Sequence, residues 1–172
     1  MSTNEPALEP DFPDDLPRDE AADPALPERI RTMVEKERFA VLSTQGEGQP
    51  YASLIAFAMS ADLTTVIFAT PITTRKYHLL VECDRVALLV DSRSQGEKDM
   101  MQIEACTATG RAKQLEAGPD WDCWAELLIA KHPQLASFVH SPTSALFRID
   151  IIRYFHVGRF QEVSQWRPAR SG

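Results

Sequence analysis

Short apolar segments separated by polar turns occupy the centre of the chain. They are rich in Val, Ile, Phe and Thr, a composition typical of β-strands. Six such segments can be recognised, at residues 39–44, 51–58, 65–70, 85–91, 102–109 and 145–157. The glycine-bearing turn between the first two predicts a hairpin, and the last segment is long enough for one or two strands. Residues 85–91 are aliphatic without polar alternation, so we expect this strand to be buried on both faces.

Helical periodicity interrupts these strands rather than alternating with them. Apolar residues recur at helix spacing in four segments, at residues 28–36, 73–83, 120–131 and 134–140. In the third segment Trp121, Trp124 and Leu128 form a broad stripe, which we expect to pack against the sheet rather than to cover a substrate. Six or seven hairpin-spaced strands with inserted helices predict a mostly β fold, an antiparallel barrel with helical decoration.

The charge of the chain is concentrated at its N-terminus. Residues 1–27 hold eight acidic residues, one arginine and six of the twelve prolines, and their excess of seven negative charges equals the net charge of −7. We therefore expect a disordered acidic tail over residues 1–25, one domain over 26–165 and a short C-terminal tail over 166–172. The neutral body favours neither a nucleic-acid partner nor an anionic membrane surface.

The remaining composition predicts a cytoplasmic protein without a metal site. No apolar run approaches the roughly 18 residues that span a bilayer, and the acidic N-terminus does not resemble a secretory signal. Cys83, Cys106 and Cys123 have the spacing of neither a disulfide framework nor a paired metal site, so we expect three thiols.

The sharpest chemical signal lies between the third strand segment and the following helix. Thr73 or Thr74 is suited to cap the helix, and Arg75 and Lys76 then occupy its first turn. Two cations at a helix N-terminus are unfavourable unless an anion shares the site, because the helix end already carries partial positive charge. Backbone N–H groups, hydroxyls and two cations together describe a phosphate pocket. From these residues alone, a pair of solvated surface charges is an equally good interpretation.

Three stretches give the chain a family resemblance. They are Gly-Gln-Pro-Tyr-Ala-Ser-Leu-Ile-Ala-Phe at residues 48–57, Phe-Ala-Thr-Pro-Ile-Thr-Thr-Arg-Lys at 68–76 and Asp-Arg-Val-Ala-Leu-Leu-Val at 84–90. In this order and spacing, residues 28–160 resemble the FMN-binding split-barrel superfamily, the pyridoxamine 5′-phosphate oxidase-like proteins. The resemblance implies a split β-barrel, bound FMN used in electron or hydride transfer, and a homodimer with the flavin at the subunit interface.

The resemblance also implies a set of cofactor-binding residues. Arg75 and Lys76 match the pair that grips the FMN phosphate, with Thr74 as the assisting hydroxyl. The ribityl chain and the ring would lie beside Ser53, Leu54, Ile55, Ala56, Ala69 and Thr70. Weaker candidates for contacts across the interface are Ser92, Arg93, Arg159 and Phe160.

Departures from the family pattern narrow the range of activities that the resemblance implies. Ser53 stands where a true pyridoxamine-phosphate oxidase has arginine, and its C-terminal substrate signature has no counterpart here. Val-Gly-Arg-Phe at residues 157–160 instead resembles a motif of the haem-utilisation branch. An alternative is therefore haem binding or degradation, for which the candidate axial ligands are His78, His132, His140 and His156. A flavin-binding module without enzymatic activity is a further alternative, and no residue is assigned as catalytic.

Overall fold

The computed structural model describes residues 24–94, 102–158 and 162–169. Within these ranges eight strands form one antiparallel sheet in the order β2-β1-β5-β6-β7-β4-β3, with β8 beside β7. The strands are β1 (Phe39–Gly46), β2 (Gln49–Ala56), β3 (Ala58–Met59), β4 (Thr65–Pro71), β5 (Arg85–Asp91), β6 (Ala105–Gln114), β7 (Ser144–Gly158) and β8 (Glu162–Trp166). The helices are α1 (Leu26–Lys36), α2 (Arg75–Glu82), α3 (Pro119–Lys131), the 3-10 turn η2 (Pro133–Leu135) and α4 (Ala136–Val139). The predicted antiparallel β fold with inserted helices is confirmed.

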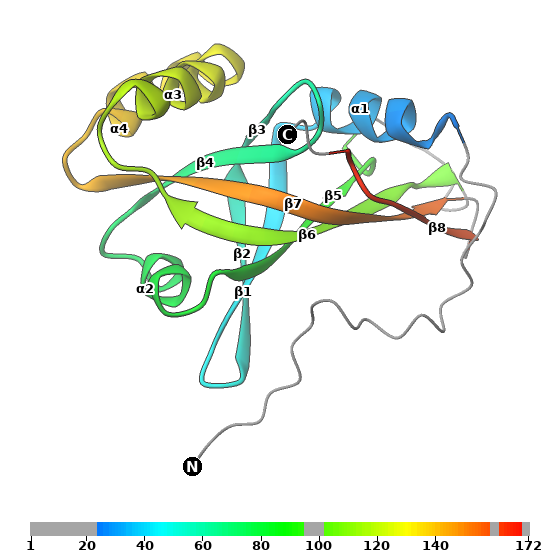
Figure 1. The fold of residues 1–172 in the computed structure, drawn as a ribbon, viewed down its shortest axis with the longest axis horizontal. Coiled ribbons are helices and arrows are strands. Elements are labelled where there is room, and N and C mark those ends of the chain that lie inside the picture. The colour runs from blue at the N-terminus through cyan, green and yellow to red at the C-terminus, as the bar shows by residue number, and fades with distance from the viewer. Residues whose placement is uncertain (1–23, 95–101, 159–161, 170–172) are drawn as a thin grey trace.

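The sheet is strongly curled, so that β1 and β2 run steeply across β6 and β7 (Figure 1). The long strand β7 holds the two parts together, because it pairs with β6 along most of its length, with β4 through its first half and with β8 through its second. The pairing of β6 with β7 shifts register between Thr109 and Gly110, whose partners are Arg153 and Ile151, so that Ile152 is an extra residue in β7. A Cβ at Gly110 would lie 2.6 Å from the carbonyl oxygen of Asp150, so this close approach of two strands requires glycine.

The predicted first hairpin is confirmed. β1 and β2 pair without interruption from Phe39 opposite Ala56 to Gly46 opposite Gln49. The two turn residues, Glu47 and Gly48, both have positive φ, at 52° and 74°. This is the turn geometry whose twist matches that of a two-stranded ribbon.

Two hydrophobic clusters stabilise the curled sheet. The larger one fills the concave side, where α1 contributes Ile30 and Met33 and the rings of Phe68 and Phe147 stack at 5.6 Å. In the smaller cluster, α3 packs Leu128 onto the other side of β4 and β7. Trp121 and Trp124 pack against this second cluster, as expected for a structural stripe. Each fully buried side chain of this size contributes about 1.5–3 kcal/mol to folding.

Three strand expectations need correction. The central strand β5 is buried on one face only: Val86, Leu88 and Val90 point inward, whereas Ala87 and Leu89 are half-buried on a face that no helix of the described chain covers. Strand β6 begins at residue 105 rather than 102 and continues to 114. The short strands β3 and β8 were not predicted separately, and Trp166, expected in the C-terminal tail, ends β8 and stacks on Tyr154 at 5.4 Å.

The helices lie at the edges of the sheet. α1 and α3 pack on opposite faces of the sheet, at different ends of it, and α2 is near the β1–β2 hairpin (Figure 1). None of the helices in the described part of the chain is long and apolar enough to cross a membrane.

Candidate functional site

The predicted phosphate loop connects β4 to α2, and its geometry is fixed by two threonines. Thr74, not Thr73, is the N-cap of α2: its Oγ1 accepts a hydrogen bond from the backbone N–H of Tyr77 at 3.4 Å. The same hydroxyl donates to the carbonyl oxygen of Pro71 at 2.9 Å and lies 3.0 Å from Oγ1 of the fully buried Thr70. The end of β4 and the start of α2 are therefore connected by side-chain hydrogen bonds as well as by the backbone.

Arg75 and Lys76 follow the cap, as expected. The first turn of α2 holds no acidic residue, and neither cation forms an ion pair with another described residue. Lys76 is half-buried, and this desolvation lowers the pKa of its ammonium group. A half-buried cation beside an exposed one, at the positive end of a helix, makes this corner of the molecule electrostatically suited to an anion.

Tyr51 is a site residue that the sequence analysis did not assign. The guanidinium carbon of Arg75 lies 5.4 Å from the centroid of the Tyr51 ring, a distance at which the ring face attracts a cation. Tyr51 belongs to β2, so this contact connects the two stretches expected to hold the cofactor. An aromatic residue two positions before Ser53 was the available signal, but only the fold shows that it meets Arg75.

The expected ring-binding strand presents its residues on alternate faces. Ile55 is buried and Ser53 shares its face, whereas Leu54 is exposed and Ala56 shares the opposite one. The Oγ atom of Ser53 is buried and has no hydrogen-bond partner among the described residues. Ala69 is half-buried in β4, which contacts β2. These residues therefore lie in the same region as the α2 N-terminus.

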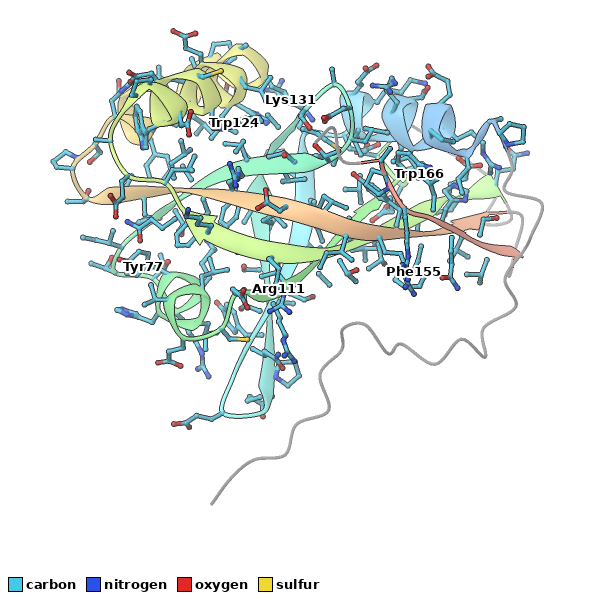
Figure 2. The ribbon with its side chains drawn as sticks, in the orientation of Figure 1. Tyr77, Arg111, Trp124, Lys131, Phe155 and Trp166 are labelled. Carbon is cyan, nitrogen blue, oxygen red and sulfur yellow. The ribbon has the colours of Figure 1, made fainter. Side chains whose placement is uncertain are left out.

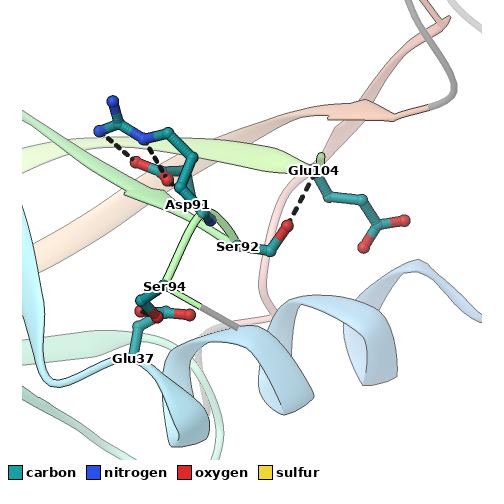
Figure 3. Close-up of polar contacts among 6 residues, drawn as sticks. Glu37, Asp91, Ser92, Ser94 and Glu104 are labelled. Carbon is teal, nitrogen blue, oxygen red and sulfur yellow. Dashed lines mark hydrogen bonds and ion pairs between the residues drawn. The ribbon is translucent and has the colours of Figure 1, made fainter. Parts of the chain in front are cut away.

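Ser92 and Arg93 lie elsewhere. They follow the far end of β5, whose seven residues separate them from the α2 end of that strand by about 23 Å. Ser92 is buried, and its Oγ accepts a hydrogen bond from the backbone N–H of Glu104 at 3.0 Å (Figure 3). Arg93 is exposed and pairs with both carboxylate oxygens of Asp91, at 2.6 and 2.9 Å, which lowers the pKa of Asp91. Within one chain neither residue reaches α2, and their contact across an interface stays a prediction.

Two of the expected cross-interface residues cannot be placed. Arg159 and Phe160 lie outside the described residues.

The four histidines fall into two pairs. His132 is completely buried, its Nε2 lies 2.9 Å from the carbonyl oxygen of Phe57, and desolvation lowers its pKa. His156 is also buried, 3.8 Å from a carboxylate oxygen of Glu104. His78 and His140 are exposed. Burial of His132 and His156 inside the domain does not suit either of them to bind a haem iron from the surface.

No three His, Cys, Asp or Glu side chains come together in a metal-binding arrangement within the described part of the chain.

Most of the chain matches the model of one known protein family. Residues 26–158 match the family model described as pyridoxamine 5′-phosphate oxidase. A comparison with curated proteins finds no match.

Solved structures share the fold at low sequence identity. A haem-binding protein from Mycobacterium smegmatis superimposes with a TM-score of 0.74 at 16% identity, covering 82% of this chain but 57% of its own. HutZ, the haem storage protein of Vibrio cholerae, gives 0.64 at 14% identity, with 72% and 88% covered. An FAD-binding protein from Mesorhizobium loti gives 0.61 at 16% identity, with 75% and 91% covered. At these identities the likeness establishes the fold, and proteins of this fold include both flavin and haem binders.

Proposed function

Because the chain belongs to the pyridoxamine 5′-phosphate oxidase family, we propose that it is a flavoprotein that binds FMN with its phosphate at the N-terminus of α2. This proposal rests mainly on the positions of Arg75 and Lys76. Both lie in the first turn of α2, a helix capped by Thr74 whose first turn contains no acidic residue. A phosphate dianion would offset the repulsion between these cations and the helix end. It would also supply a charge partner for the half-buried Lys76, which forms no ion pair with another described residue.

The residues around α2 have the chemistry that a phosphate and a sugar-like chain require. The hydroxyl groups of Thr74 and Thr70, 3.0 Å apart, hold the loop in place, and Arg75 supplies a planar set of donors for phosphate oxygens. Tyr51 lies under the guanidinium and holds it in place by cation–π attraction. The protein's part is thus to bind and orient the phosphate end through charge and hydrogen bonds.

The ring of the cofactor would lie along β2. This strand offers small residues and the exposed Leu54 on one face. On the other face lies the buried hydroxyl of Ser53, which has no hydrogen-bond partner in the part of the chain that the structure describes. A buried hydroxyl without a partner costs about 1–3 kcal/mol, which a polar group of a ligand could offset. When bound, FMN would supply hydride or electron transfer, and the chain would supply orientation and electrostatics. We therefore propose oxidoreductase activity on a small molecule, with a non-enzymatic flavin-binding module as the alternative.

Flavin retention tests the site. We expect the full-length protein to purify with FMN, and the double variant R75A/K76A to lose at least 90% of it while remaining folded. The matched control is K36A/R38A, which removes an exposed lysine and an exposed arginine at the C-terminal end of α1 and should retain FMN. A wild-type protein that neither carries nor takes up FMN, or an R75A/K76A variant with stoichiometric FMN, would overturn the proposal. Reduction of the bound flavin by NADH or NADPH would favour an enzyme over a module.

The absorption spectrum also separates FMN from haem. Two flavin bands in the visible range support the proposal, whereas a single intense Soret band would support haem binding. The buried positions of His132 and His156 favour the flavin, because a haem iron would need one of the exposed histidines, His78 or His140, or a residue beyond the described ranges.

The sheet offers a surface for a second copy of the chain. The outward-facing residues of β1, β2, β5, β6, β7 and β8, here called the outer face, follow from the strand registers. Several are exposed and apolar: Phe39 (52%), Leu54 (65%), Val157 (39%) and Val163 (50%). The aliphatic strand β5 crosses the middle of this face. We propose that a homodimer covers it, because contiguous apolar surface on a soluble domain typically marks a protein interface.

A further inference from the structure

A half-buried lysine lies outside the proposed flavin site, at the end of α3. The Nζ atom of Lys131 donates to the carbonyl oxygen of Val34 at 2.7 Å and lies 4.1 Å from the centroid of the buried Phe57 ring. Val34 is one of the last four residues of α1, where carbonyl oxygens lack partners within the helix, so the lysine supplies the donor that this oxygen needs. Figure 2 shows Lys131 between α3 and α1, well away from Tyr77 of α2.

Lys131 lines a cavity of about 290 Å³ between α1, α3 and β3. Arg31 of α1 closes one side of it, because its guanidinium donates to the carbonyl oxygen of Ala61 in the loop after β3. Most of the other lining side chains are apolar, among them Val34, Met59, Leu63 and Leu127. None of the lining residues belongs to the strands of the outer face, so the proposed dimer does not use them. An amine and an apolar cavity are thus brought together at the β3 edge of the sheet.

Burial keeps part of the Lys131 amine neutral near physiological pH. Desolvation lowers its pKa from 10.5 to about 8, Arg38 adds to the shift, and Glu35 and Glu37 oppose it. Lys131 forms no ion pair with any residue in the described ranges. At pH 7.5 about a quarter of an amine with this pKa is neutral, against about one part in a thousand at a pKa of 10.5. The neutral amine is the form that attacks a carbonyl carbon, and desolvated lysines form Schiff bases in this way.

We propose that Lys131 is a covalent binding site for a small apolar aldehyde, which forms a reversible imine with Nζ. The amine adds to the carbonyl carbon, the adduct takes up one proton and loses one water molecule, and a C=N bond replaces the C=O bond. Nothing is oxidised or reduced in this step. The apolar side chains of the cavity wall would cover the carbon skeleton of the aldehyde. The volume is just below the 300–1,000 Å³ usual for drug-sized ligands, so the aldehyde would be small.

The surroundings of Nζ favour an imine over other lysine adducts. A protonated imine keeps one N–H and the positive charge. The Val34 carbonyl oxygen and the Phe57 ring face, which hold the ammonium, therefore also stabilise the iminium. A carbamate formed with carbon dioxide, or an amide formed with an acyl donor, would lose the positive charge above the ring. The site is thus suited to an aldehyde.

Reductive trapping with benzaldehyde tests this proposal. The full-length protein is incubated at pH 7.5 with benzaldehyde and sodium cyanoborohydride, and peptide mass spectrometry gives the labelling rate of each amine. We expect Lys131 to be labelled at least tenfold faster than the exposed Lys36 and Lys113. Its labelling should saturate with benzaldehyde and fall at least fivefold with toluene, which has the same ring but forms no imine. The N-terminal amine, whose ordinary pKa of about 7.7–8.0 is similar, is an internal reference, and its labelling should not respond to toluene.

Variants identify the amine that is responsible. K131R keeps a cation beside Val34 and Phe57 but forms no imine, so the saturable, toluene-sensitive part of the total labelling should disappear from the intact mass. The matched control K113R should keep it at the wild-type rate, within twofold.

Three results would overturn the proposal. The first is a Lys131 that is labelled no faster than Lys36 and Lys113. The second is fast labelling that neither saturates nor responds to toluene, because the reactivity would then come from the pKa alone, without binding in the cavity. The third is saturable labelling that persists in K131R, which would place the site at another amine. The labelling needs no flavin, so a protein without FMN still gives a readable result.

Discussion

At the residue scale, Lys131 shows how burial can make a charge sensitive to pH. Its Nζ donates to the carbonyl oxygen of Val34 at 2.7 Å, near the end of α1, and lies 4.1 Å from the centroid of the buried Phe57 ring. Desolvation lowers the pKa of this ammonium from 10.5 to about 8, although Glu37 opposes the shift. Because the folded chain releases this proton at a lower pH than the unfolded chain, the group makes stability rise with pH between about 8 and 10.5.

We therefore expect the substitution K131M to flatten part of the alkaline stability profile. Urea unfolding at pH 7.5 and at pH 9.5 gives the free energy of unfolding of the wild type and of K131M. Between these pH values the wild type should gain about 1 kcal/mol relative to K131M, a value reduced for partial solvent exposure. The exposed Lys113 gives a matched control, K113M, for which the difference should not change with pH. A wild-type advantage that falls as pH rises would contradict the assignment. Cys106 and Tyr154 have raised pKa values, which make stability fall as pH rises. Their contributions are the same in the wild type and in the variant, so they cancel when the two free energies of unfolding are subtracted.

At the element scale, α2 depends on its cap for both stability and the proposed site. Thr74→Ala removes the acceptor for the Tyr77 N–H and the contacts to Thr70 and Pro71. We expect a loss of about 1 kcal/mol in the free energy of unfolding and weaker FMN retention, with T74S restoring most of both. Thr73 is exposed and does not cap the helix, so T73A is the matched control. Equal losses in T73A and T74A, by urea unfolding and flavin release, would contradict this role.

Local signals in the sequence predicted those elements that local interactions decide. The hairpin of β1 and β2 and the start of α2 were found because turn residues and a capping threonine act over a few positions. The prediction that β5 is buried on both faces was wrong for the single chain, because an aliphatic composition does not show which face of a strand is covered. The contact of Arg75 with Tyr51 was not predicted, because it depends on how segments more than twenty residues apart in the sequence fold together. A single sequence does not show which distant residues will meet at the site.

At the scale of the whole molecule, the proposed homodimer would cover the face of β5 that is only half-buried in the single chain. Leu89 lies between Val41 and Thr107 in the register of three neighbouring strands, near the middle of the outer face. A strand whose aliphatic residues are only half-covered in the single chain would be fully buried in a dimer. The sequence expectation of a strand buried on both faces would then hold for the assembly and not for one chain.

The substitution L89E tests this arrangement. In one chain the new carboxylate would remain within reach of water, whereas in a dimer it would be buried without a partner, at a cost of several kcal/mol. We expect sedimentation equilibrium to show a dimer constant at least 100-fold weaker, with the circular dichroism spectrum unchanged. V81E is the matched control, because Val81 is 63% exposed on α2 and not on the sheet. If L89E remains as dimeric as V81E, the outer face is not the interface. Because the resemblance implies a flavin between subunits, the monomeric L89E protein should also lose FMN.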